Sequence, residues 1–193
     1  MFASKSGKRE KIMERLTIAN SRVKQLLAKL NNQISILDER EKILFERLVS
    51  LIEYKDSARA NIVASEISQI RNLKKHLIAF QVVLENISLR IDNIILIGDI
   101  SKDLPTLLGI VREARNIIKG VFPGMEIEFI ALEEDLKGVA TEMKDFSIYN
   151  SMEYNPSASS DAKKILEEAY LVAEERIRSS MPKVGDRDLK IKS

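Results

Sequence analysis

Residues 16–51 read LTIANSRVKQLLAKLNNQISILDEREKILFERLVSL, and this stretch decides the fold. A leucine or valine stands at every seventh position within it: Leu16, Val23, Leu30, Leu37, Leu44 and Leu51. Apolar residues on a heptad spacing form one stripe along a helix, and such a stripe is buried against another helix. The stretch belongs to a longer run, residues 8–97, that contains neither glycine nor proline. We therefore expect nearly uninterrupted helix over this run.

A second heptad series occupies the later part of the same run. Its apolar positions are Val63, Ile70, Leu77, Leu84 and Ile91, accompanied by Leu73, Phe80, Ile87 and Ile94. A polar break, Lys55-Asp56-Ser57, separates the two series, and either Asp56 or Ser57 can cap the second helix. The pattern predicts two helices, residues 8–52 and 58–97, packed as a long antiparallel hairpin.

The sequence after residue 97 predicts three shorter helices. The first covers residues 103–119, where Pro105 suits the opening turn because its missing N–H costs little there. Two glycines and a proline within residues 120–124 end that helix, and a fourth helix follows with apolar residues at positions 129, 132, 136, 139 and 143. Residues 145–160 lack periodicity and are typical of a linker. Ser160 is then expected to cap a last helix over residues 161–180.

These patterns define the expected fold class and domain organisation. The fold is all-α, with a long antiparallel helical hairpin, shorter third and fourth helices, and a detached fifth helix after a flexible linker. We expect a helical core over residues 1–144, the linker over 145–160, and a C-terminal helix with its tail over 161–193. Residues 1–7 are mostly small and polar, and we expect them to be mobile and to precede the first helix.

The composition argues against an enzyme. The chain has no cysteine, which excludes a disulfide or a thiolate metal site, and its single histidine, His76, lacks the preceding glutamate of a Glu-x-x-His metal pair. No glycine-rich phosphate loop is present, and the adjacent carboxylates Glu133 and Glu134 are interpreted as a solvated helix face. We expect no catalytic residue, no metal and no cofactor, and we expect His76 to lie in solvent or at a rim.

The apolar stretches of the chain are short. None near the first residues has the length of a signal-peptide core, and the densest one, residues 94–97, is far too short to cross a bilayer. The expectation is a soluble or peripheral protein.

Charge is distributed unevenly, although the net charge is only +2. Residues 1–30 hold eight Lys/Arg and two Glu, whereas residues 126–175 hold thirteen Asp/Glu and four Lys. One set of cations repeats every seven residues beside the apolar seam: Lys8, Arg15, Arg22 and Lys29. The equivalent later positions are Ile36 and Ile43. Such a chain can attract an anionic surface at one end and a copy of itself at the other.

This layout resembles that of the ESCRT-III proteins. A long basic helix hairpinned onto a second, a shorter third helix, an acidic fourth helix, a linker and a small fifth helix follow one another over residues 8–181. The lack of Cys and Trp and the wealth of Ile are more similar to the archaeal cell-division branch. The resemblance implies a membrane-remodelling polymer without its own nucleotide site, disassembled by a separate AAA ATPase. It also implies a cytoplasmic protein, peripheral on the inner face of the cell membrane, that co-assembles with its paralogues.

The resemblance also implies roles for particular residues. The basic flank matches the surface that the family applies to anionic lipids, and Phe2 matches a short apolar leader. The predicted membrane-binding residues are Phe2, Lys8, Lys11, Arg15, Arg22, Lys24 and Lys29. The acidic helices match segments that fold back on the hairpin in a closed subunit or reach a neighbour in the polymer. The predicted subunit-contact residues are Glu126, Glu128, Glu133, Glu134 and Asp135.

The end of the chain has two interpretations. Met181, Pro182 and Val184 resemble the tail motif that many family members offer to the MIT domain of their ATPase, although Gly185 replaces a second proline and Met181 the leading leucine. The alternative is a helix stop followed by a polar tail.

Two other functions stay open. The chain could be a discrete coiled-coil scaffold or adaptor that binds a protein partner without polymerising. Nucleic-acid binding through the same basic flank is disfavoured, because no aromatic side chains stand among its charges to stack on bases. We therefore expect no nucleic-acid partner.

Overall fold

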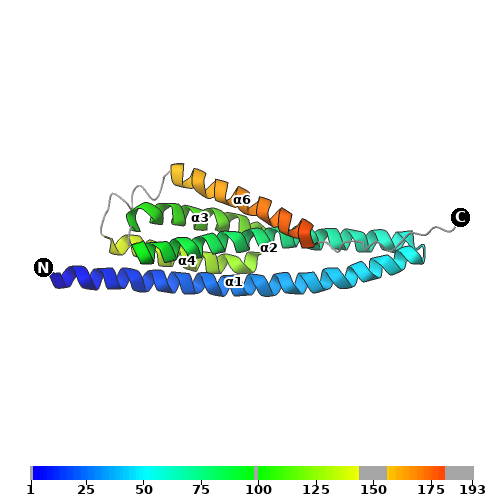
Figure 1. Cartoon of the computed structure of the whole chain (residues 1–193), viewed down its shortest axis with the longest axis horizontal. Coiled ribbons are helices and arrows are strands. Elements are labelled where there is room, and N and C mark those ends of the chain that lie inside the picture. The colour runs from blue at the N-terminus through cyan, green and yellow to red at the C-terminus, as the bar shows by residue number, and fades with distance from the viewer. Residues whose placement is uncertain (1, 98–99, 144–155, 181–193) are drawn as a thin grey trace.

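The computed structural model describes residues 2–97, 100–143 and 156–180, and every regular element in these ranges is helical (Figure 1). The elements are α1 (Phe2–Glu53), α2 (Ser57–Ile97), α3 (Ile100–Val121), the 3-10 turn η1 (Pro123–Met125), α4 (Glu126–Glu142) and α6 (Pro156–Ser180). The predicted all-α fold is confirmed.

The long hairpin forms as the heptads predict. Leu16, Val23 and Leu30 of α1 are completely buried, and the seam of α2 is buried along its whole length. Helix α1 begins at Phe2, earlier than predicted. The reason is that Gly7 costs a helix only about 1 kcal/mol, which a helix of this length can absorb.

The turn between α1 and α2 is short and capped. Lys55 takes a φ of 58°, the left-handed conformation that ends a helix. Asp56 then caps α2, since its Oδ1 accepts a hydrogen bond from the backbone N–H of Arg59 at 3.1 Å. Of the two predicted caps, Asp56 is therefore the one that forms.

Two buried polar clusters lie along the otherwise apolar seam. Asn20 donates to Asp92 at 2.6 Å and accepts from Ser88 at 2.7 Å. Further along, the buried Glu41 accepts from Arg71 at 2.7 Å and from Lys74 at 2.9 Å. A one-step slip of the helices would leave these groups unsatisfied, so the clusters fix the register of the hairpin.

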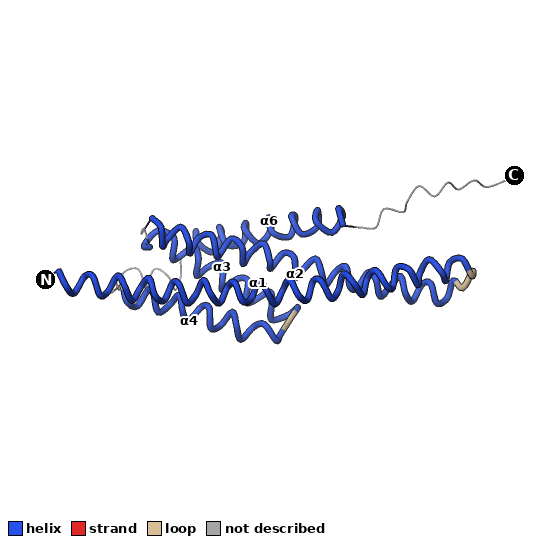
Figure 2. The backbone as a smooth tube through the Cα atoms, turned by 60° about the horizontal axis from the view of Figure 1, so that its bottom comes forward, coloured by secondary structure: helices blue, strands red, loops and turns tan. Residues whose placement is uncertain are grey.

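Helices α3 and α4 cover only the half of the hairpin that carries the N-terminus (Figure 1). The turn between them lies about midway along the hairpin, and α4 returns from it beside α1 (Figure 2). Phe80 of α2 meets Phe129 of α4 inside this half, with ring centroids 6.4 Å apart. The remaining half of the hairpin, residues 36–73, is covered by neither α3 nor α4 and is called the far half below.

Helix α6 is separated from α4 by a long segment of sequence, but it packs against the other helices. It packs against α2 and α3, and its inner face is buried in the same core. That face consists largely of small residues, which allow close approach: Ala162, Leu166, Ala169, Ala173 and Ile177. The helix begins at Pro156, earlier than predicted, because proline is well suited to a first helical turn. Residues 145–155 of the predicted linker lie outside the described residues, and its last five residues, 156–160, are helical, so the linker prediction was wrong there.

Candidate functional site

The cations of α1 predicted to bind lipid are Lys11, Arg15, Arg22, Lys24 and Lys29. At about 100° per residue, Lys11, Arg15, Arg22 and Lys29 share one side of the helix, which we call the basic face, whereas Lys24 lies about 200° around the axis from Arg22. The side chains of Phe2 and Lys8, also predicted to bind membrane, lie outside the described part of the structure. Lys11 and Lys24 are exposed and have no ion pair among the described residues. The other three members of the basic face all contact α4.

These three cations form a ladder with three acids of α4. Arg22 Nε lies 2.8 Å from Asp135 Oδ2, Arg15 Nη2 lies 3.7 Å from Glu142 Oε1, and Lys29 pairs with Glu128. Each step of seven residues forward along α1 is matched by a step of seven backward along α4. The ladder therefore joins two antiparallel helices in a single register.

Gly138 makes room for one rung of the ladder. A Cβ atom at this position would collide with the guanidinium of Arg15, which crosses over the backbone of α4 there. A mid-helix glycine is otherwise unfavourable by about 1 kcal/mol. Its place in α4 is explained by the passage of Arg15 toward Glu142.

Apolar packing, rather than the ladder, holds α4 in place. Phe129, Leu132, Leu136 and Val139 are completely buried, and burying such a side chain contributes about 1.5–3 kcal/mol. The ladder pairs are partly exposed, and pairs of this kind contribute about 0–1 kcal/mol each. The ion pairs therefore select the register and orientation of α4 more than they supply its affinity.

A relative from an archaeon decides the family. The cell division protein B1 of Sulfolobus acidocaldarius is 36% identical over 168 residues, which cover 87% of this chain and 78% of that protein. The chain belongs to the archaeal cell division protein B family.

A second relative agrees with this assignment. The cell division protein B of the same organism is 26% identical over 185 residues, covering 95% of this chain and 70% of that protein. Both relatives are named for cell division and neither for an enzymatic activity. No model of a protein family matches the chain, and no solved structure matches it.

In this cell division protein B family member, the acidic residues predicted for subunit contact are engaged within the chain. Glu128 and Asp135 belong to the ladder, Glu126 lies 3.7 Å from Lys119, and Glu134 is exposed beside Lys137. This is the arrangement that the closed-subunit alternative expects.

Glu133 does not lie on a solvated face, and that interpretation was wrong. Its carboxylate is almost completely buried and accepts hydrogen bonds from Arg112 at 2.9 Å and from Arg115 at 2.6 Å. Burial alone would raise the pKa of Glu133, but hydrogen bonds from Arg112 and Lys137 and the nearby positive charges outweigh it, so the pKa lies below its ordinary value. Sequence reasoning missed this clamp because its two arginines belong to α3 and its acid to α4.

A contact between α2 and α6 was also missed. His76, expected in solvent or at a rim, is half-buried, and its Nδ1 lies 3.0 Å from the hydroxyl of Tyr170 on α6. The two rings meet edge to face at 84°. Burial raises the pKa of Tyr170. Nothing near either residue in the sequence signals the other, since 94 positions separate them.

Three further predictions concern the tail motif, membrane-spanning helices and metal sites. Met181, Pro182 and Val184 of the tail motif lie outside the described residues. Within the described ranges, no helix is long and apolar enough to span a bilayer. The same ranges place no three of His, Asp and Glu where they could hold a metal ion.

Proposed function

We propose that this protein forms filaments on anionic membranes and remodels them during cell division, as an ESCRT-III-like protein without catalytic activity. The observation that carries the proposal is the basic face of α1. One of its cations, Lys11, is exposed, and three are held by acids of the same chain at matching heptad steps. The exposed part of this surface is available to bind lipid, and displacement of α4 would make the paired cations available as well.

The energetics of this surface suit reversible binding. A lysine or arginine close to an anionic membrane contributes about 1 kcal/mol, so Lys11 alone gives weak attachment. Displacement of α4 would free Arg15, Arg22 and Lys29 and more than double the number of available cations. Displacement would also expose the apolar face of α4, which needs a new partner.

A neighbouring copy is the partner proposed for the displaced α4. The acids that pair with α1 within one chain have the same spacing as the cations of any other copy. An exchanged contact would be heterologous, and such contacts produce open filaments when the rotation does not close. Paralogues with the same spacing would co-assemble in the same way, and a MIT-domain AAA ATPase would act on the tail.

The place of action follows from this proposal. Anionic lipids on the cytoplasmic leaflet attract basic segments, so we place the protein on the inner face of the cell membrane. The helical core of residues 1–144 would form the filament, with residues 161–193 as its regulatory end.

The test uses sedimentation with vesicles that contain an anionic phospholipid. The variant Lys11→Glu/Lys24→Glu is expected to lose most binding, because it replaces the exposed cation on each side of α1 by a repelling charge. The side that meets the vesicle loses about 1 kcal/mol of attraction, roughly a fivefold change in affinity, before repulsion is added. The control Lys42→Glu/Arg47→Glu changes the net charge equally, on exposed residues of the far half of α1. If both variants bind equally well, the basic face is not the lipid surface. A separate requirement of the proposal is that electron microscopy of the vesicle-bound wild-type protein shows filaments.

A discrete scaffold is the second candidate. The specific observation in its favour is that the chain by itself buries a core shared by α1, α2, α3, α4 and α6. A scaffold would stay monodisperse at every concentration and ignore vesicles. Analytical ultracentrifugation with and without vesicles separates the two functions.

A further inference from the structure

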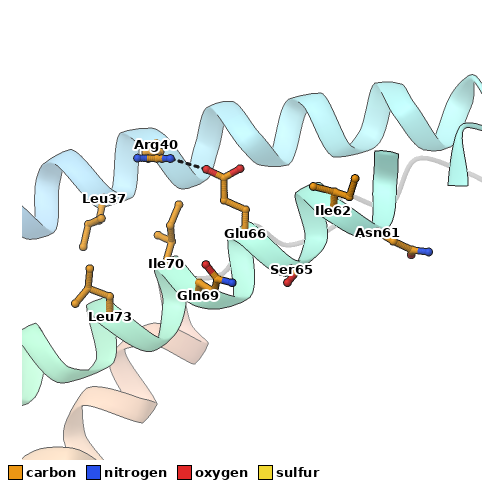
Figure 3. A pocket seen from close by; sticks show the side chains of 9 residues that line it. All are labelled: Leu37, Arg40, Asn61, Ile62, Ser65, Glu66, Gln69, Ile70 and Leu73. Carbon is orange, nitrogen blue, oxygen red and sulfur yellow. Dashed lines mark hydrogen bonds and ion pairs between the residues drawn. The ribbon is translucent and has the colours of Figure 1, made fainter. Parts of the chain in front are cut away.

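A groove runs between α1 and α2 in the far half of the hairpin (Figure 3). Its volume is about 770 Å³, and its apolar lining includes Leu37 of α1 and Ile62, Ile70 and Leu73 of α2. Arg40 Nη2 and Glu66 Oε1 bridge the two helices across it at 2.5 Å.

The chemistry of the groove favours a protein as its occupant. The cation on its wall, Arg40, is already paired with Glu66, and the other polar residues, Asn61, Ser65 and Gln69, are uncharged. A lipid headgroup or a nucleic acid would require free cations. An apolar lining with a neutral polar rim instead fits an apolar helix ridge that carries an amide or two.

A ridge of this kind is present at the opposite end of α2. Leu89, Leu96 and Ile97 are 63%, 81% and 78% exposed, and Asn93 is exposed between them. Large apolar side chains exposed together in this way mark an interaction surface. Leu89 and Leu96 stand seven residues apart and so lie about 10 Å apart along the helix, which the length of the groove can accommodate.

The ridge and the groove cannot meet within one chain. Ile62 and Leu89 belong to the same continuous helix, and the rise between them is about 40 Å. Both surfaces are apolar with uncharged polar residues beside them, and only different molecules can bring them together. Since a water molecule takes up about 30 Å³, the hollow has room for several side chains.

We propose that the ridge Leu89–Leu96–Ile97 of one copy seats in the groove Leu37–Ile62–Ile70–Leu73 of a second copy. The contact rests on the proposed function in that it adds a second subunit contact to the filament, beside the exchanged α4. It is heterologous, because each copy offers a ridge at one end and a groove at the other. Parallel copies staggered by about 40 to 50 Å would leave a free groove and a free ridge for further subunits.

Cysteine cross-linking tests the contact directly, because the sequence contains no cysteine. Purified full-length Ile62→Cys and Leu96→Cys are mixed without membranes and oxidised with a copper catalyst. The Ile62–Leu96 disulfide dimer is expected to exceed, by several-fold, the dimer formed when Ile62→Cys is mixed with Leu171→Cys. Leu171 is a matched control, since it lies on α6 and is as exposed as Ile62, at 68%.

Each outcome decides the proposal. If the Ile62–Leu96 pair is no more abundant than the control pair, or if Ile62→Cys alone dimerises better than the mixture, the ridge does not occupy the groove. The variant Leu89→Asp/Leu96→Asp must also lower the sedimentation coefficient at high concentration, and it should keep its helix content because both side chains are exposed. Membranes are absent throughout, so a positive cross-link with failed vesicle binding would reject the proposed function and keep the contact.

Discussion

Arg22 and Asp135 are 113 positions apart in the chain, yet Arg22 Nε lies 2.8 Å from Asp135 Oδ2. This pair is the middle rung of the α1–α4 ladder, with Arg15–Glu142 on one side and Lys29–Glu128 on the other. The rungs cover the cations that a lipid surface would need. Helix α4 thus links the conformation of the subunit to the charge that it displays.

Neutralising the acids of the ladder should open it. In Glu128→Gln/Asp135→Asn/Glu142→Gln, the three pairs contribute little to folding, and we expect a loss of only about 1–2 kcal/mol in the free energy of unfolding. Amide hydrogen exchange in α4 should become faster, and sedimentation with anionic vesicles should increase because three cations are released.

The control for this experiment carries the same change of net charge elsewhere. Glu39→Gln/Glu46→Gln/Glu53→Gln alters exposed acids of the far half of α1. Equal vesicle binding by the two triple variants would mean that the ladder does not restrain the basic face.

Glu133→Gln should destabilise the protein by about 1–3 kcal/mol, because the hydrogen bonds from Arg112, Arg115 and Lys137 lose their charged acceptor. Chemical denaturation measures this loss. The exposed neighbour Glu134→Gln serves as a control and should change stability little. A loss no larger than that of the control would contradict the role of Glu133 as a clamp.

The same residue predicts an acid-labile component of stability. The pKa of Glu133 in the folded chain lies below the ordinary value of 4.5, so its contribution is present above that pH and is lost as pH falls through the lower folded value. The free energy of unfolding of the wild type should therefore decline below about pH 4.5 more steeply than that of Glu133→Gln. Parallel pH profiles would show that Glu133 is not responsible.

Tyr170→Phe should loosen α6. The change removes the hydrogen bond to His76 and keeps the aromatic ring, so a loss of about 1 kcal/mol is expected. Hydrogen exchange in α6 should accelerate while exchange in α1 stays the same. Tyr54→Phe, at a tyrosine that is 84% exposed, should affect neither helix.

Asp56→Ala should cost about 1 kcal/mol, because the first N–H groups of α2 lose their acceptor. Ser57→Ala should cost much less, since Asp56 provides the cap. Thermal unfolding monitored by circular dichroism compares the two variants, and equal losses would argue against the cap described here.

The sequence predicts the hairpin well because heptad spacing is a local property. Leu16, Val23 and Leu30 reveal their burial by their own spacing, and the polar break at residues 55–57 marks the turn. The predicted helix starts were less accurate. Helix α1 begins at Phe2 and α6 at Pro156, both earlier than predicted, because a long helix tolerates Gly7 and proline suits a first helical turn.

Contacts between distant segments were harder to predict. Glu133 looks like any surface glutamate until α3 places two arginines beside it, and His76 finds Tyr170 only after α6 has docked. The ladder is visible in the sequence as a pattern, since its cations and its acids each recur every seven residues. That pattern indicates pairing in general and does not distinguish a contact within the chain from one between copies.

The even spacing of the ladder also determines how α4 can move along α1. Seven residues of helix rise about 10 Å, so only displacements of that length bring charges back into opposition. One such step toward the N-terminus would place Asp135 opposite Arg15 and Glu128 opposite Arg22, and would release Lys29. Because the same step would bring Glu142 opposite Lys8, three pairs would remain, and the unpaired cation of this series would move from one end of it to the other.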